Sequence, residues 1–217
     1  MLASETARYR LTDADVDEVA LSVASYLIVH PRGALVWDAG AVADRERAGE
    51  GGFEQCLTRR DGQERFVKIA YSLTSQLAAA GYAPGDVTHL ALSHYHWDHT
   101  ADANLFANAE WLVAQAEHDV FGDGTDVIRQ AAGHTEGHAV LYVKLANTGG
   151  IVLSGDLYHY PAERTLDRLP TFEVSEVHTK AAREKLEGFL SRTGAALWIQ
   201  HDLVAHRKLK KSPQYYY

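Results

Sequence analysis

The sequence predicts an α/β protein with a single domain, and three observations support that prediction. The chain has 217 residues, of which 46% are hydrophobic, as expected of one domain with a substantial core. Strand-like apolar runs alternate along it with segments of helical periodicity. Several of the apolar runs end in histidine or aspartate, which indicates one edge of a sheet where strand ends meet and could form a site on a rigid scaffold.

The first elements are expected before residue 87. Two apolar runs flank His30-Pro-Arg-Gly33, a turn signal, and therefore predict two strands. A stretch rich in glycine and charge then predicts a long loop. Apolar side chains recur after it at helical spacing up to Gly81, a residue suited to end a helix. The expected elements are strands over 21–29 and 33–37, a loop over 39–64 and a helix over 66–80.

The remaining elements are expected around and after a histidine-rich segment. An apolar run leads into that segment, a short helix should follow it, and a short strand comes next. Two apolar runs around Asn147-Thr-Gly-Gly150 predict a hairpin, and Ser175 is a suitable N-cap for an amphipathic helix. The elements are strands over 87–93, 111–113, 140–145, 151–154 and 195–200, and helices over 98–106 and 175–191.

The most informative segment is Ser93-His-Tyr-His-Trp-Asp-His-Thr100, which has the spacing H-x-H-x-D-H. In an extended segment residues i and i+2 point the same way, so His94 and His96 can reach one point. Asp98 and His99 are adjacent, and a bend or helix start after Trp97 would direct them to a second point nearby. Burying four such groups without partners costs free energy. We therefore interpret the segment as the start of two metal sites, whose ions lie ~3.5–4 Å apart in proteins.

Three later segments could supply the remaining ligands. Gly133-His-Thr-Glu-Gly-His138 lies between two apolar stretches, and Ile151-Val-Leu-Ser-Gly-Asp156 is a buried-strand pattern that ends in a carboxylate. Leu197-Trp-Ile-Gln-His201 is another apolar run, and it ends in a histidine. Imidazole and carboxylate ligands suit zinc and similar divalent cations, and such a site can leave a position open for water.

In this order the four motifs resemble those of the metallo-β-lactamase-fold hydrolases. Ser154-Gly-Asp-Leu-Tyr-His-Tyr160 and Gln200-His-Asp202 favour the N-acyl homoserine lactonase-like branch of that family. The resemblance runs from about residue 21 to the C-terminus. It implies a four-layer αβ/βα sandwich formed by one domain over residues 1–217, in which two sheets lie between helices with the metals at one edge.

The resemblance also implies two divalent metal ions per chain and a set of ligands for them. Zinc is the expected metal, with iron, cobalt or manganese as alternatives. A hydroxide between the ions would attack the carbonyl carbon of the substrate. The implied ligands are His94, His96 and His134 for the first ion, Asp98, His99 and His201 for the second, and Asp156 as the bridge.

The residue that would donate a proton during the reaction is left open by the sequence. The resemblance places a tyrosine three residues after the bridging aspartate, where this chain has His159 between two tyrosines. The candidate catalytic residues are therefore Asp98, Tyr158, His159 and Tyr160. His138, four residues after His134, is expected to lie outside the metal shell.

Asp38 in Val36-Trp-Asp-Ala-Gly40 matches a turn that the family places beneath the site, although Ala39 replaces the usual threonine. Two roles stay open for this carboxylate. It could orient a metal-ligating histidine, as carboxylates often do, or it could belong to a simple turn at the end of a strand.

Composition limits the partners and the compartment. A formal net charge of −8 argues against nucleic acid as a partner, because no basic stripe is present to neutralise phosphates. Cys56 is the single cysteine, so no internal disulfide is expected and a reducing cytoplasm is the expected location. The N-terminus has no leader-like pattern, and no apolar run approaches ~20 residues, so no membrane association is expected.

The sequence therefore predicts a metal-dependent hydrolase that opens a lactone ring, with N-acyl homoserine lactones (quorum quenching) as the leading substrates and a homodimer as one option. Two alternatives stay open. The same centre could hydrolyse a thioester, β-lactam or organophosphate, or the protein could bind metal without catalysis. Family members usually have more sequence before the first strand and a longer connection than residues 114–133 provide. The pocket could therefore be open, be completed by a partner subunit, or have lost its activity.

Overall fold

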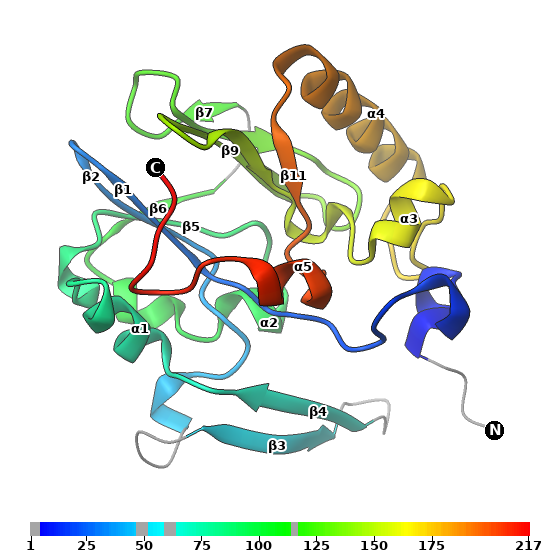
Figure 1. Ribbon diagram of the computed structural model, residues 1–217, viewed down its shortest axis with the longest axis horizontal. Coiled ribbons are helices and arrows are strands. Elements are labelled where there is room, and N and C mark those ends of the chain that lie inside the picture. The colour runs from blue at the N-terminus through cyan, green and yellow to red at the C-terminus, as the bar shows by residue number, and fades with distance from the viewer. Residues whose placement is uncertain (1–4, 47–51, 59–63, 114–116) are drawn as a thin grey trace.

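Two β-sheets face each other in this protein, and helices cover their outer sides (Figure 1). The computed structural model describes residues 5–46, 52–58, 64–113 and 117–217. One sheet has four strands in the order β1-β2-β5-β6, and the other has five in the order β11-β10-β9-β8-β7. Strands β3 and β4 form a separate two-stranded hairpin.

The strands are β1 Tyr26–His30, β2 Gly33–Trp37, β3 Phe53–Thr58, β4 Glu64–Ile69, β5 His89–Ala91, β6 Glu110–Leu112, β7 His118–Asp119, β8 Asp126–Gln130, β9 Ala139–Leu145, β10 Gly149–Leu153 and β11 Ala196–Trp198. The α-helices are α1 Leu73–Ala79, α2 Trp97–Thr100, α3 Pro161–Thr165, α4 Glu176–Thr193 and α5 Leu203–Lys208. The 3₁₀ helices are η1 Glu5–Tyr9, η2 Asp13–Asp15, η3 Asp44–Glu46, η4 Pro84–Asp86, η5 Ala103–Phe106 and η6 Gly155–Leu157.

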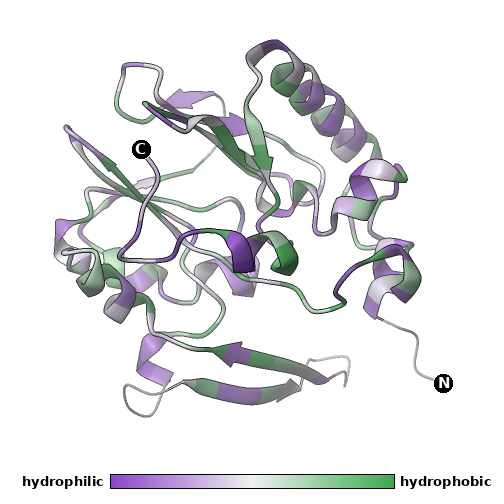
Figure 2. Cartoon of the chain, in the orientation of Figure 1, coloured by the Kyte–Doolittle hydropathy of each residue, from purple (hydrophilic) through white to green (hydrophobic). Residues whose placement is uncertain are grey.

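Three clusters of buried apolar side chains define the layers. Between the sheets, Trp37 of β2 packs in one cluster with Leu141 of β9. Helix α4 covers the outer face of the five-stranded sheet through a second cluster that includes Leu186, and Figure 2 shows this helix banded in hydrophobic and hydrophilic colours. On the other side, Leu77 of α1 and Phe106 of η5 cover the four-stranded sheet. The predicted four-layer αβ/βα sandwich is confirmed.

The strand directions bring the chemically active motifs to one edge of the sandwich. β2 and β5 are parallel, and so are β10 and β11, so the carboxyl ends within each pair lie together. β9 is antiparallel to β10, which places the turn before β9 at the same edge. The segments after β5, β10 and β11 and the turn before β9 carry the four histidine and aspartate motifs.

The region between the first two strands and the histidine-rich segment differs from the prediction. The loop expected over 39–64 contains β3, and the first residues of the helix expected over 66–80 belong to β4. Val67 and Ile69 pair with β3 across the hairpin, and such β-branched residues suit a pleated sheet better than a helix. Ser72 then caps the first turn of α1. The apolar spacing that indicated a helix was compatible with a strand as well.

Other expected elements are present with shifted ends, and several were not predicted. The connection 114–133 contains β7 and β8, while residues 114–116 lie outside the described part of the chain. Helices α3 and α5 have only five and six residues, which is too short to produce a recognisable hydrophobic period. Within the described ranges, none of the helices combines the length and apolar character that crossing a membrane requires.

Gly133 provides a test of how closely the turn before β9 packs on α4. Its φ is +145°, and a Cβ at this position would lie 2.3 Å from the backbone nitrogen of Thr179. Because that atom belongs to the helix backbone, it cannot move aside as a flexible side chain could. We expect Gly133→Ala to lower the free energy of unfolding by more than about 2 kcal/mol, measured by urea denaturation.

Gly137 in the same turn is the matched control, because no atom lies within 4 Å of the position a Cβ would take there. Gly137→Ala should change the free energy of unfolding by about 0.5 kcal/mol or less. Equal stability of the two variants would contradict the close packing of this turn on α4.

Candidate metal centre

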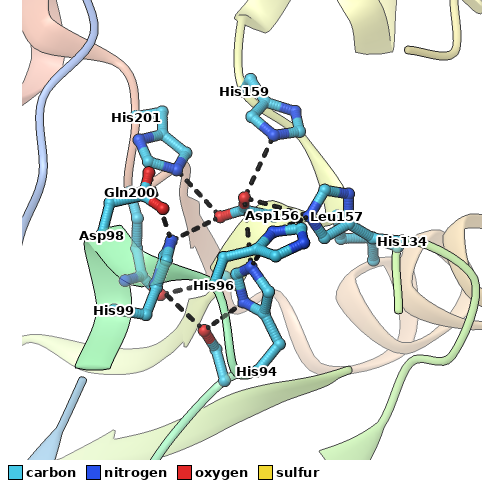
Figure 3. Close-up of polar contacts among 12 residues, drawn as sticks. His94, His96, Asp98, His99, His134, Asp156, Leu157, His159, Gln200 and His201 are labelled. Carbon is cyan, nitrogen blue, oxygen red and sulfur yellow. Dashed lines mark hydrogen bonds and ion pairs between the residues drawn. The ribbon is translucent and has the colours of Figure 1, made fainter. Parts of the chain in front are cut away.

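Side chains from four segments converge at the edge of the sandwich around one carboxylate, as Figure 3 shows. The loop and short helix after β5 contribute the first group, the turn before β9 the second, and the segments after β10 and β11 the rest. The seven predicted ligands are all among them: His94, His96, Asp98, His99, His134, Asp156 and His201.

Asp156 occupies the centre of the arrangement and is only 4% exposed. Its Oδ2 lies 3.5 Å from His94 Nε2 and 3.3 Å from His134 Nε2. Its Oδ1 lies 3.0 Å from His99 Nε2 and 2.8 Å from His201 Nε2. The two oxygens of one carboxylate thus face two separate sets of histidines, which is the geometry expected of a bridging ligand between two cations.

The first set has three imidazole nitrogens directed at one point. His96 Nδ1 lies 2.8 Å from His94 Nε2 and 3.0 Å from His134 Nε2. Each nitrogen of a neutral imidazole offers either one N–H or one lone pair. His96 Nδ1 therefore cannot form a good hydrogen bond with both of its neighbours. A divalent cation accepts lone pairs from all three, and the donor set therefore fits a metal ion.

The second set contains Asp98, His99 and His201, whose ligand atoms lie within 4.8 Å of one another. His99 Nε2 is buried, and its 3.0 Å contact with Asp156 lacks the angle of a hydrogen bond, so it has no hydrogen-bond partner. His201 Nδ1 donates to the carbonyl oxygen of Ser22 at 2.6 Å, which leaves Nε2 of the neutral ring with its lone pair. A buried nitrogen without a hydrogen-bond partner, such as His99 Nε2, is unfavourable, and a bound cation would give it a partner.

Carboxylates behind the imidazole rings hold their orientation. His134 Nδ1 lies 3.0 Å from Glu173 Oε1, and His99 Nδ1 lies 2.8 Å from Asp38 Oδ2. Asp38 is 1% exposed and also accepts a hydrogen bond from the backbone nitrogen of Ser93. Of the two roles left open for Asp38, the structure supports that of an orienting carboxylate. Glu173 lies in no motif, and only the folded structure brings it to His134.

Gln200 connects the two sheets beneath the centre. Its Nε2 donates to Asp38 Oδ2 at 2.9 Å, while its Oε1 accepts from Trp37 Nε1 and from the backbone nitrogen of Gly155, both at 2.8 Å. Because Trp37 ends β2 and Gly155 follows β10, one amide group links the supports of both sets of histidines. The sequence contained Gln200 within a motif but did not indicate this role.

Burial and charge set the protonation of the cluster. Burial lowers the pKa of His94 and His96, since desolvation disfavours the imidazolium form. Burial opposes ionisation of Asp156 too, but the surrounding histidines outweigh it and hold the pKa of this carboxyl well below its usual range. Burial would lower the pKa of His99, but the neighbouring carboxylates of Asp156 and Asp38 outweigh this effect and raise the pKa. The site thus keeps an anionic carboxylate among imidazoles, where a cation is favoured.

The structure separates the candidate catalytic residues. His159 Nε2 lies 3.2 Å from Asp156 Oδ2 and belongs to the cluster, and Asp98 lies at its rim, 4.0 Å from His99 Nε2. The Tyr158 hydroxyl instead donates to Glu187 on α4 at 3.1 Å. The Tyr160 hydroxyl donates to the carbonyl oxygen of Val19 at 2.6 Å. Neither phenol is directed at the carboxylate.

His138 is held entirely by the backbone. Its Nδ1 donates to the carbonyl oxygen of Ala131 at 3.0 Å, and its Nε2 accepts from the backbone nitrogen of Asp156 at 2.9 Å. Both ring nitrogens are therefore occupied, and the ring positions Asp156 without reaching a cation. This agrees with the expectation that His138 lies outside the metal shell.

Known proteins resemble the chain in sequence and in structure. Residues 19–119 match the family model of the metallo-beta-lactamase superfamily. The chain is 30% identical over 241 residues to the N-acyl homoserine lactonase AttM of Rhizobium johnstonii, covering 90% of this chain and 88% of that protein.

Two solved structures share the fold. One is an N-acyl homoserine lactone hydrolase with the product N-hexanoyl-L-homoserine at its catalytic metal center, with a TM-score of 0.75, 17% identity and coverage of 90% of this chain and 87% of that one. The other is AidC, a dizinc quorum-quenching lactonase, with a TM-score of 0.59, 17% identity and coverage of 83% and 72%.

The burial of His138 predicts a pH dependence of stability in the metal-free protein. Burial lowers the pKa of His138 to about 3, whereas a histidine in an unfolded chain titrates near 6.5. Between these pH values the unfolded state binds a proton at this histidine and the folded state does not. The stability that the protein gains by keeping His138 neutral is therefore complete above pH ~6.5 and is lost as the pH falls. We expect His138→Gln to reduce the slope of unfolding free energy against pH by about one proton, or about 1.4 kcal/mol per pH unit.

Urea denaturation of the metal-free protein between pH ~4 and ~7 measures this slope. His178→Gln, a substitution on the exposed side of α4, is the control and should keep the wild-type slope. Identical slopes for His138→Gln and the wild type would show that His138 is not buried in its neutral form.

Proposed function

Because the chain belongs to the metallo-β-lactamase superfamily, in its N-acyl homoserine lactonase-like branch, we propose that it is a metal-dependent hydrolase that opens N-acyl homoserine lactones. The main support in the structure is the shared carboxylate of Asp156. One of its oxygens faces His94 and His134, and the other faces His99 and His201. A carboxylate shared in this way suits a centre with two neighbouring cations.

The two sets of side chains would hold two divalent ions, which we propose to be zinc, with iron, cobalt or manganese as alternatives. When bound, such ions polarise a carbonyl group and lower the pKa of water to about 7, which supplies a nucleophile at neutral pH. The similar structure of AidC, a dizinc lactonase, supports zinc. The proposed holders are His94, His96 and His134 for one ion, Asp98, His99 and His201 for the other, and Asp156 for both.

The protein's own contribution is orientation and exclusion of water. Asp38 and Glu173 lie behind the imidazoles of His99 and His134 and aim their Nε2 atoms at Asp156. The Phe172 ring packs against His134 in a T-shaped contact, with 5.8 Å between ring centroids. Fixed ligands in a dry environment strengthen the electrostatic interactions that stabilise a developing oxyanion.

The rim of the centre offers a surface for an acyl tail. Trp97 is 41% exposed and Tyr95 is 69% exposed, and both flank His96 in the chain. Phe106, Leu157 and Tyr158 are buried in the core and offer no such surface. We therefore assign the contact with an acyl chain to Trp97 and Tyr95.

Ring opening of a lactone releases a proton and can be followed with a pH indicator. We expect the zinc-loaded protein to open N-hexanoyl-L-homoserine lactone, a chelator to abolish this activity, and zinc to restore it. His96→Ala removes a proposed ligand and should lower kcat/KM by at least on the order of 100-fold. The matched control His178→Ala changes an exposed histidine of α4 and should retain activity.

The same preparation separates the alternatives. Faster turnover of a thioester, a β-lactam or a phosphotriester than of any lactone would contradict the proposed substrate class. Tight binding of two ions without turnover of any of these esters would identify a non-catalytic metal-binding protein instead.

We also propose that single-domain protomers form a homodimer in the cytoplasm. The presence of a single cysteine supports a reducing compartment. Phe66 on β4 and Tyr71 just after it are 68% and 66% exposed, and a two-stranded hairpin is only marginally stable on its own. Analytical ultracentrifugation should give twice the mass of one chain and should give that of a monomer for Phe66→Glu. A wild-type monomer would contradict the dimer.

A further inference from the structure

We propose that His159 is an additional metal ligand, which joins Asp156 and His201 in binding a cation. This inference rests on the proposed function, because it concerns the same centre. It assigns a role to the residue at which the chain departs from the tyrosine that the family resemblance implied.

The position of the ring gives the first argument. His159 Nε2 lies 3.2 Å from Asp156 Oδ2, while His201 Nε2 lies 2.8 Å from Asp156 Oδ1. The two imidazoles are stacked, with centroids 5.3 Å apart and an angle of 6° between their planes. Figure 3 shows His201 facing one oxygen of Asp156 and His159 facing the other. One ligand atom from each of the three residues lies within 4.8 Å of the others, close enough for one cation to bind all three.

Packing keeps the ring in this position. His159 is 3% exposed, and Tyr9 and Phe172 contact its ring with centroid distances of 4.8 Å and 5.7 Å. The phenols on either side of it in the chain are anchored elsewhere, as described above. The segment therefore presents a histidine, and neither tyrosine, to Asp156.

A buried carboxylate lies behind His159, as it does behind other proposed ligands. His159 Nδ1 is 3.5 Å from Glu163 Oε2, within ion-pair range but without hydrogen-bond geometry. Glu163 is fully buried. Arg183 Nη2 at 3.2 Å and the backbone nitrogen of Tyr160 at 2.8 Å hold its side chain in place. Metal-binding histidines commonly have such a carboxylate at their distal nitrogen.

The other buried histidines show which pattern accompanies a ligand. His134 and His99 have Glu173 and Asp38 at the distal nitrogen and a free direction toward Asp156. His138 has backbone partners on both nitrogens. His159 follows the first pattern, with Glu163 behind it and Asp156 in front of it.

Cobalt binding without substrate tests the assignment. Metal-free wild type, His159→Gln and the surface control His178→Gln are titrated with Co²⁺ by calorimetry, while the visible absorption bands of the bound ion are recorded. We expect His159→Gln to weaken one of the two binding events by at least about 10-fold and to change the absorption bands of that ion. The other binding event and the control should match the wild type.

A milder variant and a measurement on the wild type keep the test valid if His159→Gln misfolds. Glu163→Gln keeps the size of the side chain and removes its charge, and it should weaken the same event by about 10-fold. In cobalt-loaded wild type, ring N–H protons of ligating histidines are paramagnetically shifted. ¹⁵N-histidine labelling should assign one of these shifted signals to His159.

Wild-type affinity and spectrum in His159→Gln, or no shifted signal for His159, would overturn the assignment even if lactone hydrolysis were lost. The residue would then be a substrate contact. Failure of the wild type to open lactones would overturn the proposed function and leave this inference standing, because metal binding is measured without substrate.

Discussion

One buried carboxylate surrounded by imidazoles is the constraint on which this structure depends. Asp156 is almost inaccessible to water. Burying its negative charge would cost free energy without hydrogen-bond donors or cations around it. Nitrogens from five histidines lie within 3.5 Å of its two oxygens. These histidines come from segments that are far apart in the chain, so the carboxylate is satisfied only when both sheets are assembled at this edge.

The scaffold around Asp156 leaves little freedom to the groups it positions. Gly155 has a φ of +50°, and a Cβ there would lie 2.6 Å from His138 Nε2, so the backbone must approach that ring closely. His138 and Gln200 in turn bind the backbone of this segment and connect it to both sheets. Preorganisation of this kind would hold the proposed metal ligands at productive distances before a cation binds.

The centre combines the side chains of the four motifs with buried carboxylates that support their imidazole rings. Asp38 and Glu173 orient histidines of the expected set. Glu163 and Arg183 form a buried ion pair on the α3–α4 side of the centre and stand behind His159. A buried ion pair contributes little net stability in general, so its presence here is better explained by the position it imposes on the imidazole.

The sequence by itself determined the α/β class, the four motifs and the seven residues that the fold brings together. Spacing within a short segment carries local geometry, and so His94, His96, Asp98 and His99 could be predicted to point at two neighbouring positions. The prediction of a helix over Phe66–Ile69 was wrong, because a short apolar run is compatible with the period of a helix and with that of a strand. Only the tertiary structure decided that Ser22 supports His201 across 179 positions, that Glu173 supports His134, and that His159 rather than a tyrosine reaches Asp156. Such contacts form when distant segments pack, and no local pattern of residues records them.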